Sequence, residues 1–361
     1  MRCECFSCIT DLLDYLQNNL LIAHYCGFNI MKPLPFYWTL DRFINGIDNE
    51  LLQSLMHSQV KKLYEAGIID ASFIALDSTP IMANTSHNNP ESFKKDKLKS
   101  YNQPKSDKNC GLGVHTASNQ HNEKKFEFYW GYKNHVLVDC ITGLPIFELT
   151  TTADVHDCSV ALNILSQTNN FLPINDCTFI EDKAYDVKEI YNTVKAVYNG
   201  DCAFPLNKRN TKNPEKFPSG HPLCEAGFAM NKDGNGRTRQ KYCCPFKQSE
   251  NFVCPCNHMN WNNGKKNKGC TKYVTFPDDY RLSIDRDFIS FKKIYSFRTE
   301  IERYNSRFKQ TGQERLWVHG MNAARNLNTI AHISLLAAAY AAIVTHSSCS
   351  YSSLKSVKRI A

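Results

Sequence analysis

Two aspartates each follow a short apolar segment of the kind that forms a buried β-strand. Asp77 follows residues 73–76, and Asp182 comes shortly after residues 179–180. A carboxylate at the carboxyl end of such a strand lies where open α/β sheets bind their ligands. Carboxylate oxygens are also the ligands that Mg²⁺ and Mn²⁺ prefer. The alternative is that either aspartate, taken singly, belongs to a strand-end turn or a helix cap.

A third carboxylate lies in the segment YSFRTEIERYNSRFK, residues 295–309. At about 100° per residue, one helix face spanning a roughly 60° arc presents a phenol, a guanidinium, a carboxylate and an ammonium group, from Tyr295, Arg298, Glu302 and Lys309. Such a row could follow a phosphodiester backbone, with the carboxylate at a metal and the cations on phosphates. The alternative is a solvent-exposed face of ion pairs, which the neighbouring apolar residues Ile294, Phe297 and Ile301 weaken.

Other acidic residues near these positions are weaker candidates. Glu181 and Glu300 would point away from the faces of Asp182 and Glu302, and Asp186 lies four residues beyond Asp182. Further acids suit turns and caps: Asp139, Asp154 and Asp157. We expect His156 to be structural.

The elements that must position these residues alternate between helical and strand patterns. Residues 10–66 have helical periodicity, with Asp48 or Asn49 as an N-cap. Strands are predicted at 73–81, 132–139, 144–152, 177–186 and 202–207, and helices at 155–167, 186–197, 285–309 and 322–345. The polar stretch 84–125 is predicted to be a long surface loop. This order predicts a mixed α/β fold.

With both aspartates and the four-residue row in place, the sequence resembles the DDE transposases of bacterial insertion sequences. It is similar to the branch with the Y-(2)-R-(3)-E-(6)-K signature, which Tyr295, Arg298, Glu302 and Lys309 match in full. Asp77 and Asp182 match the first and second catalytic aspartates of the family. Segments 131–145 and 151–157 also resemble this family, and the resemblance runs from about residue 35 to residue 340.

The resemblance implies an RNase H-like core with a mixed five-stranded sheet, flanking helices and an insert before the helix that bears the glutamate. Asp77, Asp182 and Glu302 would be the catalytic residues and would bind two Mg²⁺ (or Mn²⁺) ions. One ion would activate the attacking water or DNA 3′-OH, and the other would stabilise the leaving oxygen. Arg298 and Lys309 would bind DNA phosphates, and Tyr295 would contact the cleaved DNA end.

The implied function is a transposase that binds the terminal inverted repeats of its element, cleaves them and joins the 3′ ends to target DNA. Its partners would be double-stranded DNA and a second copy of the chain, as a homodimer on DNA. The alternative is a catalytically silent or repurposed transposase-derived protein that only binds DNA. A nuclease of the same fold without strand transfer is a weaker possibility.

Charge is concentrated in one part of the chain. The net charge is +8, and thirteen Lys and Arg residues against four acidic residues lie between Pro205 and Thr275. This segment suits phosphate contacts or, alternatively, a solvated surface. The predicted organisation is an N-terminal helical DNA-binding region at 1–68, a catalytic core at 69–207, a basic Cys-rich insertion at 208–284 and the C-terminal helices of the core at 285–361.

The sixteen cysteines are scattered, which indicates reduced thiols rather than a secreted disulfide framework. Six of them could supply a structural Zn²⁺ site in the insertion, although their spacing lacks a clean C-x₂-C pair: Cys224, Cys243, Cys244, Cys254, Cys256 and Cys270. The chain starts without a signal-peptide pattern, and its longest apolar stretch, 330–344, is shorter than a membrane span. We therefore expect no membrane partner and a cytoplasmic, nucleoid-associated protein.

Overall fold

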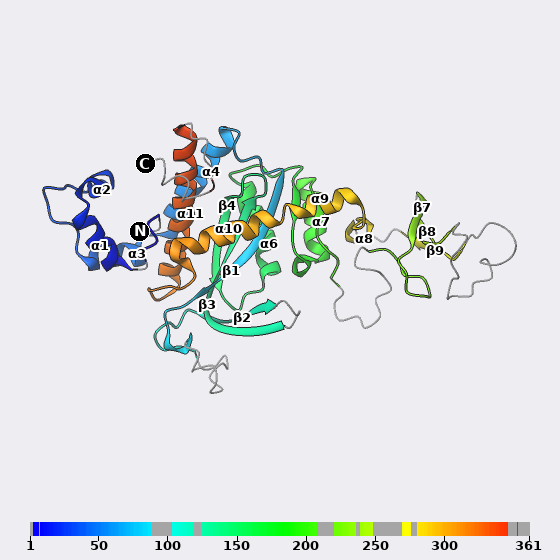
Figure 1. The fold of residues 1–361 in the computed structure, drawn as a ribbon, viewed down its shortest axis with the longest axis horizontal. Coiled ribbons are helices and arrows are strands. Elements are labelled where there is room, and N and C mark those ends of the chain that lie inside the picture. The colour runs from blue at the N-terminus through cyan, green and yellow to red at the C-terminus, as the bar shows by residue number, and fades with distance from the viewer. Residues whose placement is uncertain are drawn as a thin grey trace. The chain divides into compact units, whose positions relative to one another are not determined.

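The computed structural model describes residues 3–6, 8–88, 103–118, 124–207, 220–235, 239–247, 269–275, 280–345 and 352. The chain divides into two compact units. The first unit comprises Met1–Ile174 with Arg298–Ala361, and the second comprises Asn175–Phe297. Figure 1 shows the elements of both. Asp77 and Glu302 therefore belong to the first unit, and Asp182 to the second.

The first unit begins with four helices: α1 (Ile9–Asn18), α2 (Leu20–Tyr25), α3 (Tyr37–Gly46) and α4 (Asn49–Glu65). Asp48 is the N-cap of α4, and its side chain accepts a hydrogen bond from the backbone N–H of Glu50 at 3.0 Å. The apolar residues of α4 recur at three and four positions and are buried: Leu52, Met56, Val60 and Leu63. The predicted helical pattern of the N-terminal region is confirmed.

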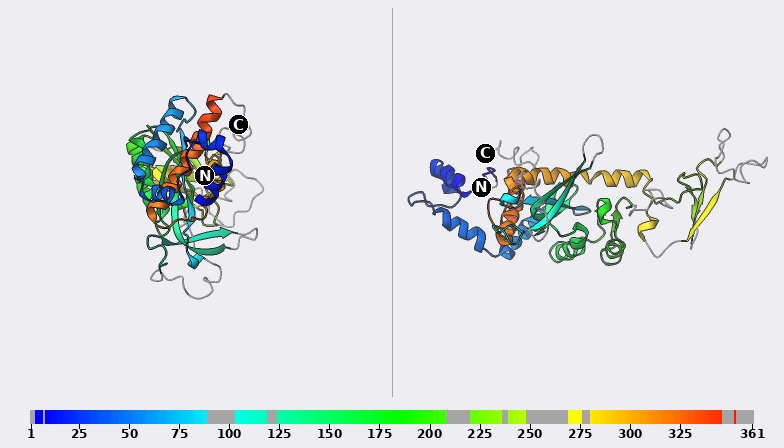
Figure 2. Two further views of the ribbon diagram at one scale, coloured as in Figure 1. Left: turned by 90° about the vertical axis from the view of Figure 1, so that its left-hand side faces the viewer. Right: turned by 90° about the horizontal axis from the view of Figure 1, so that it is seen from below.

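The sheet of the first unit is antiparallel and is built on one long strand. Its strands are β1 (Phe73–Met82), β2 (Gly111–Ser118), β3 (Lys124–Asp139) and β4 (Leu144–Thr152). β3 pairs with each of the other three. β2 pairs with the first half of β3, and together they form a long two-stranded ribbon (Figures 1 and 2).

β3 and β4, which include the predicted strands 132–139 and 144–152, form an antiparallel hairpin. Asp139 is fully buried and accepts hydrogen bonds from the backbone N–H of Thr142 at 3.0 Å and from its hydroxyl at 2.5 Å. Gly143 follows with a φ of +67°, a conformation that costs glycine little. Asp139 is thus a turn residue, as expected.

Two expectations about this sheet are wrong. Part of the stretch predicted as a loop, 84–125, forms β2 and the start of β3 instead. Asp77 lies in the middle of β1 rather than at its end, because the strand continues through Ser78–Met82 and pairs with β3 over its whole length. Strand pairing extends β1 beyond the apolar run that marks its start in the sequence.

Among the described residues, the first unit contains three further α-helices: α6 (Asp157–Asn169), α10 (Thr299–Phe308) and α11 (Met321–Val344). Short helical turns also occur at η1 (Ser86–Asn88) and η3 (Lys309–Gln313). α10 packs against β1, and α11 packs against α3, α4 and β4 (Figure 1). α6 contacts β4 and β1.

Helix α11 is longer than its apolar stretch in the sequence. Among the described residues it is the one helix long and apolar enough to cross a membrane by length and composition, and half of its most apolar window is buried inside the protein. It also buries polar side chains, including Asn326, Asn328 and His332, all below 1% exposed. Such side chains with protein partners are typical of a core helix.

The second unit contains a parallel strand pair and a separate three-stranded sheet. β5 (Thr178–Ile180) and β6 (Asp201–Ala203) are parallel and are connected through η2 (Lys183–Tyr185) and α7 (Lys188–Tyr198). β7 (Asn231–Asn235), β8 (Arg239–Cys243) and β9 (Thr271–Thr275) form the antiparallel sheet of the insertion. α8 (Tyr280–Ser283) and α9 (Ile289–Ser296) follow.

The helix predicted at 285–309 is divided between the two units. α9 ends at Ser296 and α10 begins at Thr299, with an i to i−3 hydrogen bond from Phe297 N to Ile294 O at the junction. The first unit has helices packed on an antiparallel sheet, and the second contains a βαβ element. The predicted mixed α/β class is therefore confirmed. The expected domain boundaries at 68, 207 and 284 stay predictions.

Candidate active site

Asp77 is held by one hydrogen bond to each carboxylate oxygen. It lies on β1 opposite Val136 and is partly buried. The backbone N–H of Ser78 donates to Oδ1 at 2.9 Å, and Nδ2 of Asn305 donates to Oδ2 at 2.9 Å. Asn305 belongs to α10, so the helix that carries Glu302 directly contacts the strand that carries Asp77.

Glu302 lies on the same face of α10 as Asn305, because residues three apart on a helix are neighbours. Its side chain is 56% exposed, and Oε1 lies 2.6 Å from Nη1 of Arg298. The first unit therefore brings Asp77, Glu302 and Arg298 into one region. Arg298 and Glu302 form an ion pair at i and i+4, which agrees with both the functional and the ion-pair interpretations of this face.

A neighbouring face of α10 is anchored in the core. Ile301, Tyr304 and Phe308 are each about 1% exposed. The hydroxyl of Tyr304 hydrogen-bonds Nδ1 of His332 on α11. The guanidinium of Arg307 donates from Nη2 to the carbonyl of Gly143 in the β3–β4 turn at 2.6 Å. Buried apolar and polar contacts therefore fix the rotation of α10, and with it the direction of Glu302.

The contact between Tyr304 and His332 continues into a buried polar network. Asn134 on β3 accepts from Nε2 of His332 at 2.8 Å, and its Nδ2 donates to Glu148 Oε2 on β4 at 2.6 Å. Since Asn134 turns its N–H group toward a carboxylate, its oxygen faces His332, and Nε2 of that histidine carries the proton. Burial lowers the pKa of His332 to about 3, so the imidazole is neutral.

Glu148 is the acidic centre of this network. It is 1% exposed and also accepts hydrogen bonds from Gln53 of α4 and from the hydroxyl of Thr329 of α11. Burial raises the pKa of its carboxyl above the usual value, against the effect of its hydrogen-bond donors. The partners in this network lie far apart in the sequence, so local patterns do not predict it. A polar residue inside an apolar strand run, such as Asn134, was the available signal.

Asp182 belongs to the second unit, two residues after β5. It is the N-cap of η2, and its Oδ1 accepts a hydrogen bond from the backbone N–H of Ala184 at 2.6 Å. The neighbouring Asp186 has a structural environment: it is fully buried and accepts from the hydroxyl of Tyr191 and the backbone N–H of Asn207. Partly buried Asp182 is thus more accessible than Asp186.

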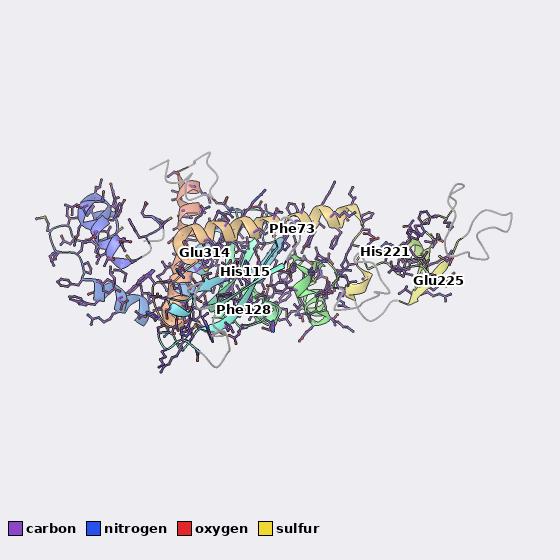
Figure 3. All side chains as sticks on the ribbon, turned by 60° about the horizontal axis from the view of Figure 1, so that its bottom comes forward. Phe73, His115, Phe128, His221, Glu225 and Glu314 are labelled. Carbon is purple, nitrogen blue, oxygen red and sulfur yellow. The ribbon has the colours of Figure 1, made fainter. Side chains whose placement is uncertain are left out.

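The other two members of the predicted row have contacts of their own. Tyr295 is in α9 of the second unit, where its ring stacks on Phe291 at a centroid distance of 6.0 Å. Lys309 begins η3 in the first unit, and its ammonium lies 3.5 Å from Glu314 Oε1. Figure 3 labels Glu314. The backbone remains helical at both element boundaries, because Phe297, Arg298, Phe308 and Lys309 all have right-handed helical φ and ψ angles.

The described cysteines of the insertion pack as apolar residues. Cys224 lies in a cluster with Met230 and Tyr242, next to Cys270. His221, labelled in Figure 3, is engaged by the carbonyl of Met230 at 2.9 Å and by Asp285 at 3.1 Å. Cys243 and Cys244 are buried, while Cys254 and Cys256 lie outside the described residues. Zinc binding stays a prediction.

Within the described part of the chain, no three His, Cys, Asp or Glu side chains form a ready metal cluster. The donor chemistry of the first unit nevertheless fits a hard cation. Asp77 and Glu302 supply carboxylate oxygens, and Oδ1 of Asn305 is a buried oxygen with no hydrogen-bond partner among the described residues. Oxygen donors of these kinds are the ligands that Mg²⁺ and Mn²⁺ select.

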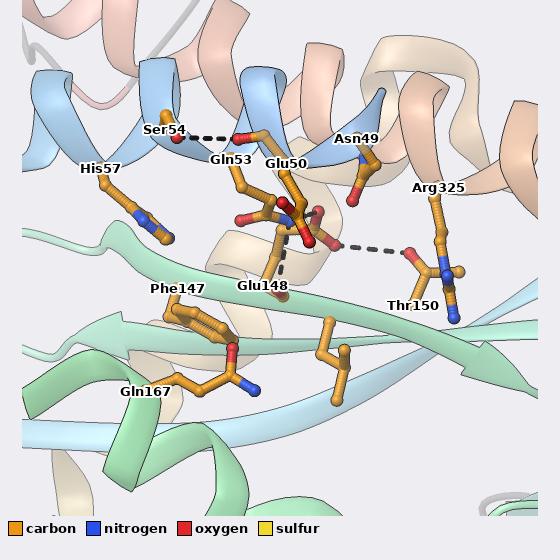
Figure 4. Close-up of a pocket in the computed structure, with 11 residues that line it drawn as sticks. Asn49, Glu50, Gln53, Ser54, His57, Phe147, Glu148, Thr150, Gln167 and Arg325 are labelled. Atoms are coloured by element: carbon orange, nitrogen blue, oxygen red, sulfur yellow. Dashed lines mark hydrogen bonds between the residues drawn. The ribbon is translucent and has the colours of Figure 1, made fainter. Parts of the chain in front are cut away.

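A separate cavity of about 410 Å³ lies between α4 and β4. Figure 4 shows Glu148 and Phe147 on the strand, Gln53 and His57 on the helix above it, and Arg325 of α11 at one side. Burial lowers the pKa of His57 to about 4. None of the predicted site residues lines this cavity.

Comparison with known proteins places these observations in a family. The family model for the transposase DDE domain matches residues 61–337. A piggyBac transposase synaptic complex with hairpin DNA is similar at 9% identity and a TM-score of 0.37, over 87% of this chain and 59% of that chain. A Mos1 transposase paired-end complex with left transposon end is similar at 12% identity and a TM-score of 0.20, over 54% of this chain and 56% of that chain.

The chain thus spans 59% of the length of the piggyBac chain. No similar protein was found among curated sequences. The match to the family model covers more than half of the chain, including Asp77, Asp182 and Glu302. The chain belongs to the transposase DDE domain family.

Proposed function

We propose that this protein binds the terminal inverted repeats of its own mobile element, cleaves the DNA there and joins the freed 3′ ends to target DNA. The observation that carries this proposal is the hydrogen bond between Asn305 and Asp77. It supports a site in which the helix bearing Glu302 lies against the strand bearing Asp77. In a chain of the transposase DDE domain family, these are the first and third carboxylates of the expected triad.

In this proposal Asp77, Asp182 and Glu302 hold the Mg²⁺ or Mn²⁺ ions. When bound, the cations supply activation of the attacking hydroxyl and stabilisation of the leaving oxygen. Asp77 is oriented for this role by its hydrogen bonds to Ser78 and Asn305. Oδ1 of Asp182 accepts one capping hydrogen bond, and a carboxylate with a single such bond retains lone pairs for a cation.

Arg298 has two roles in the proposed site. Without a cation, its guanidinium pairs with the carboxylate of Glu302 at 2.6 Å and offsets its charge. When a cation takes that carboxylate, Arg298 is released to bind a DNA phosphate, for which its planar group is well suited. Lys309 would bind a second phosphate, and Tyr295 would contact the cleaved DNA end.

DNA is the expected partner because the net charge is +8 and the excess lies in one insertion. The helical N-terminal region and the insertion would supply most of the end recognition, and a homodimer on DNA would hold two ends. We expect a protein with this partner in the cytoplasm, with the nucleoid.

A strand-transfer assay tests the function as a whole. Purified protein is incubated with labelled pre-cut repeat ends, a supercoiled plasmid and Mg²⁺. We expect labelled ends to become covalently joined to the plasmid, and shuffled end sequences to give no product. Binding of the ends without joining or cleavage would instead support the alternative of a transposase-derived protein that only binds DNA.

A further inference from the structure

Asn305 has a hydrogen bond that fixes how its amide is oriented. Its Nδ2 donates to Oδ2 of Asp77 at 2.9 Å. The opposite orientation would place the amide oxygen against a carboxylate oxygen, two acceptors without a proton between them. The carboxylate of Asp77 therefore dictates that the amide nitrogen faces β1 and that Oδ1 points elsewhere.

That oxygen is buried and has no hydrogen-bond partner among the described residues. Buried polar atoms in native proteins are nearly always paired, and an exception requires a physical reason. Two features of the surroundings suggest what is missing. The amide of Asn305 donates a hydrogen bond to the carboxylate of Asp77, and Asn305 lies on the same helix face as Glu302. An amide oxygen beside two carboxylates is a set of donors that suits a hard cation.

We propose that Asn305 belongs to the cation site: its nitrogen positions Asp77, and its oxygen is a further donor toward the cation. This inference rests on the proposed function, which supplies the cation, and adds a residue outside the three carboxylates. It also explains why position 305 carries an amide rather than a further carboxylate. A carboxylate in place of Asn305 would face Asp77 with like charge whenever the cation is absent.

A purely structural role for Asn305 predicts something different. If Asn305 only stabilises the contact between α10 and β1, removing its side chain lowers thermal stability and leaves cation affinity unchanged. Two substitutions separate these interpretations. Asn305→Ala removes both amide atoms, whereas Asn305→Asp keeps an oxygen in the position of Oδ1 and replaces the donor with an acceptor.

The experiment measures Mn²⁺ binding to the full-length protein by titration calorimetry, and thermal unfolding with and without Mn²⁺. Wild type is compared with Asn305→Ala, Asn305→Asp and Asp77→Asn. Ser306→Ala is the matched control, because Ser306 is the next residue of the same helix and is exposed. None of these readouts depends on DNA cleavage.

We expect Asn305→Ala to weaken Mn²⁺ binding roughly 10-fold, the lower end of the effect of removing residues that support metal ligands. Asn305→Asp should bind Mn²⁺ at least as tightly as wild type and should melt at a lower temperature without Mn²⁺. Saturating Mn²⁺ should restore its melting temperature, because the cation relieves the repulsion between the two carboxylates. Ser306→Ala should match wild type in both measurements.

Wild-type affinity in Asn305→Ala, or a loss of stability in Asn305→Asp that Mn²⁺ does not restore, would overturn the inference. Those results leave the proposed function intact as long as Asp77→Asn still loses Mn²⁺ binding. If Asp77→Asn binds Mn²⁺ as well as wild type does, the cation site of the proposed function fails, and the role of Asn305 fails with it.

Discussion

Glu302 contributes to the proposed chemistry far more than to the fold. Its side chain is 56% exposed and its observed partner is Arg298, one turn away on the same face of the helix. An exposed ion pair of this kind stabilises a protein by about 0–1 kcal/mol. Chemistry and stability can therefore be separated at this residue, which is rarely true of a buried acid.

Glu302→Gln should abolish metal-dependent DNA cleavage while leaving the protein folded. We expect a loss of at least about 100-fold in rate, the upper end of what removal of an outer-shell partner costs, because a ligand itself is lost. Thermal unfolding should change little. The measurement is the initial rate of nicking of labelled repeat DNA, together with a melting curve.

The control for this prediction is Glu300→Gln, a change of another acid on α10. Glu300 pairs with Arg303 and is expected to lie outside the site. It should retain cleavage. Equal losses in the two variants would show that general charge on α10 matters rather than the carboxylate of Glu302.

At the scale of the elements, the buried network decides where α10 sits. Tyr304 of α10 contacts His332 of α11, and the chain of hydrogen bonds continues through Asn134 to Glu148 and then to α4. Removing one member would leave buried partners unsatisfied, which costs about 1–3 kcal/mol for each group. The network therefore couples the direction of Glu302 to the integrity of the core.

From the burial of His332 we predict that the protein loses stability in acid. Burial lowers its pKa from 6.5 to about 3, so the unfolded chain binds a proton at a higher pH than the folded chain does. The part of the free energy of unfolding that depends on neutral His332 is fully present above about pH 6.5. It is lost as the pH falls toward 3. At pH 4.5 the loss from this residue amounts to about 3 kcal/mol.

The test compares urea unfolding of wild type and His332→Gln at pH 7 and pH 4.5. Gln retains an N–H group for Asn134 but does not titrate, so wild type should lose about 3 kcal/mol more than the variant over this interval. Glu148 acts in the opposite direction, since its raised pKa favours the folded state in acid, and it is present in both proteins. Parallel pH dependence in the two proteins would contradict the assignment of a neutral, buried His332.

The sequence predicts these elements better than it predicts their contacts. Apolar runs and the cap at Asp48 locate the helices and most strands, because those signals are local. β2 was not predicted because it lies within a long polar segment that has no sustained strand or helix period. The contacts of Asn305 and His332 could not be predicted, because their partners, Asp77 and Asn134, lie about two hundred residues away in the sequence. Only the fold brings such pairs together.

At the scale of the whole chain, DNA binding should depend steeply on salt. The basic residues of the insertion are expected to replace counterions on the DNA backbone. If about six phosphates are contacted, affinity should fall roughly a thousandfold between 50 and 200 mM salt. Fluorescence anisotropy with labelled repeat DNA, in EDTA to prevent cleavage, gives the slope. Affinity that is insensitive to salt would contradict phosphate contact by the insertion.

The slope of log affinity against log salt concentration should become shallower by up to about three when Gln replaces Lys265, Lys266 and Lys268. Each lost phosphate contact reduces its magnitude by about 0.9. Lys195→Gln is the control, because Lys195 already pairs with Asp201 at 3.0 Å. We expect its slope to match that of wild type. An unchanged slope in the triple variant would move the phosphate contacts to another part of the chain.

The central claim is that Asp77, Asp182 and Glu302 act together, although two belong to one compact unit and the third to the other. The most direct measurement is nicking of labelled DNA that carries the flanking inverted repeats, with Mg²⁺ and with EDTA. It compares wild type with Asp77→Asn, Asp182→Asn and Glu302→Gln. We predict Mg²⁺-dependent nicks at the repeat boundary for wild type and their loss in all three variants. Cleavage that persists in EDTA, or in any one of the variants, would contradict the account.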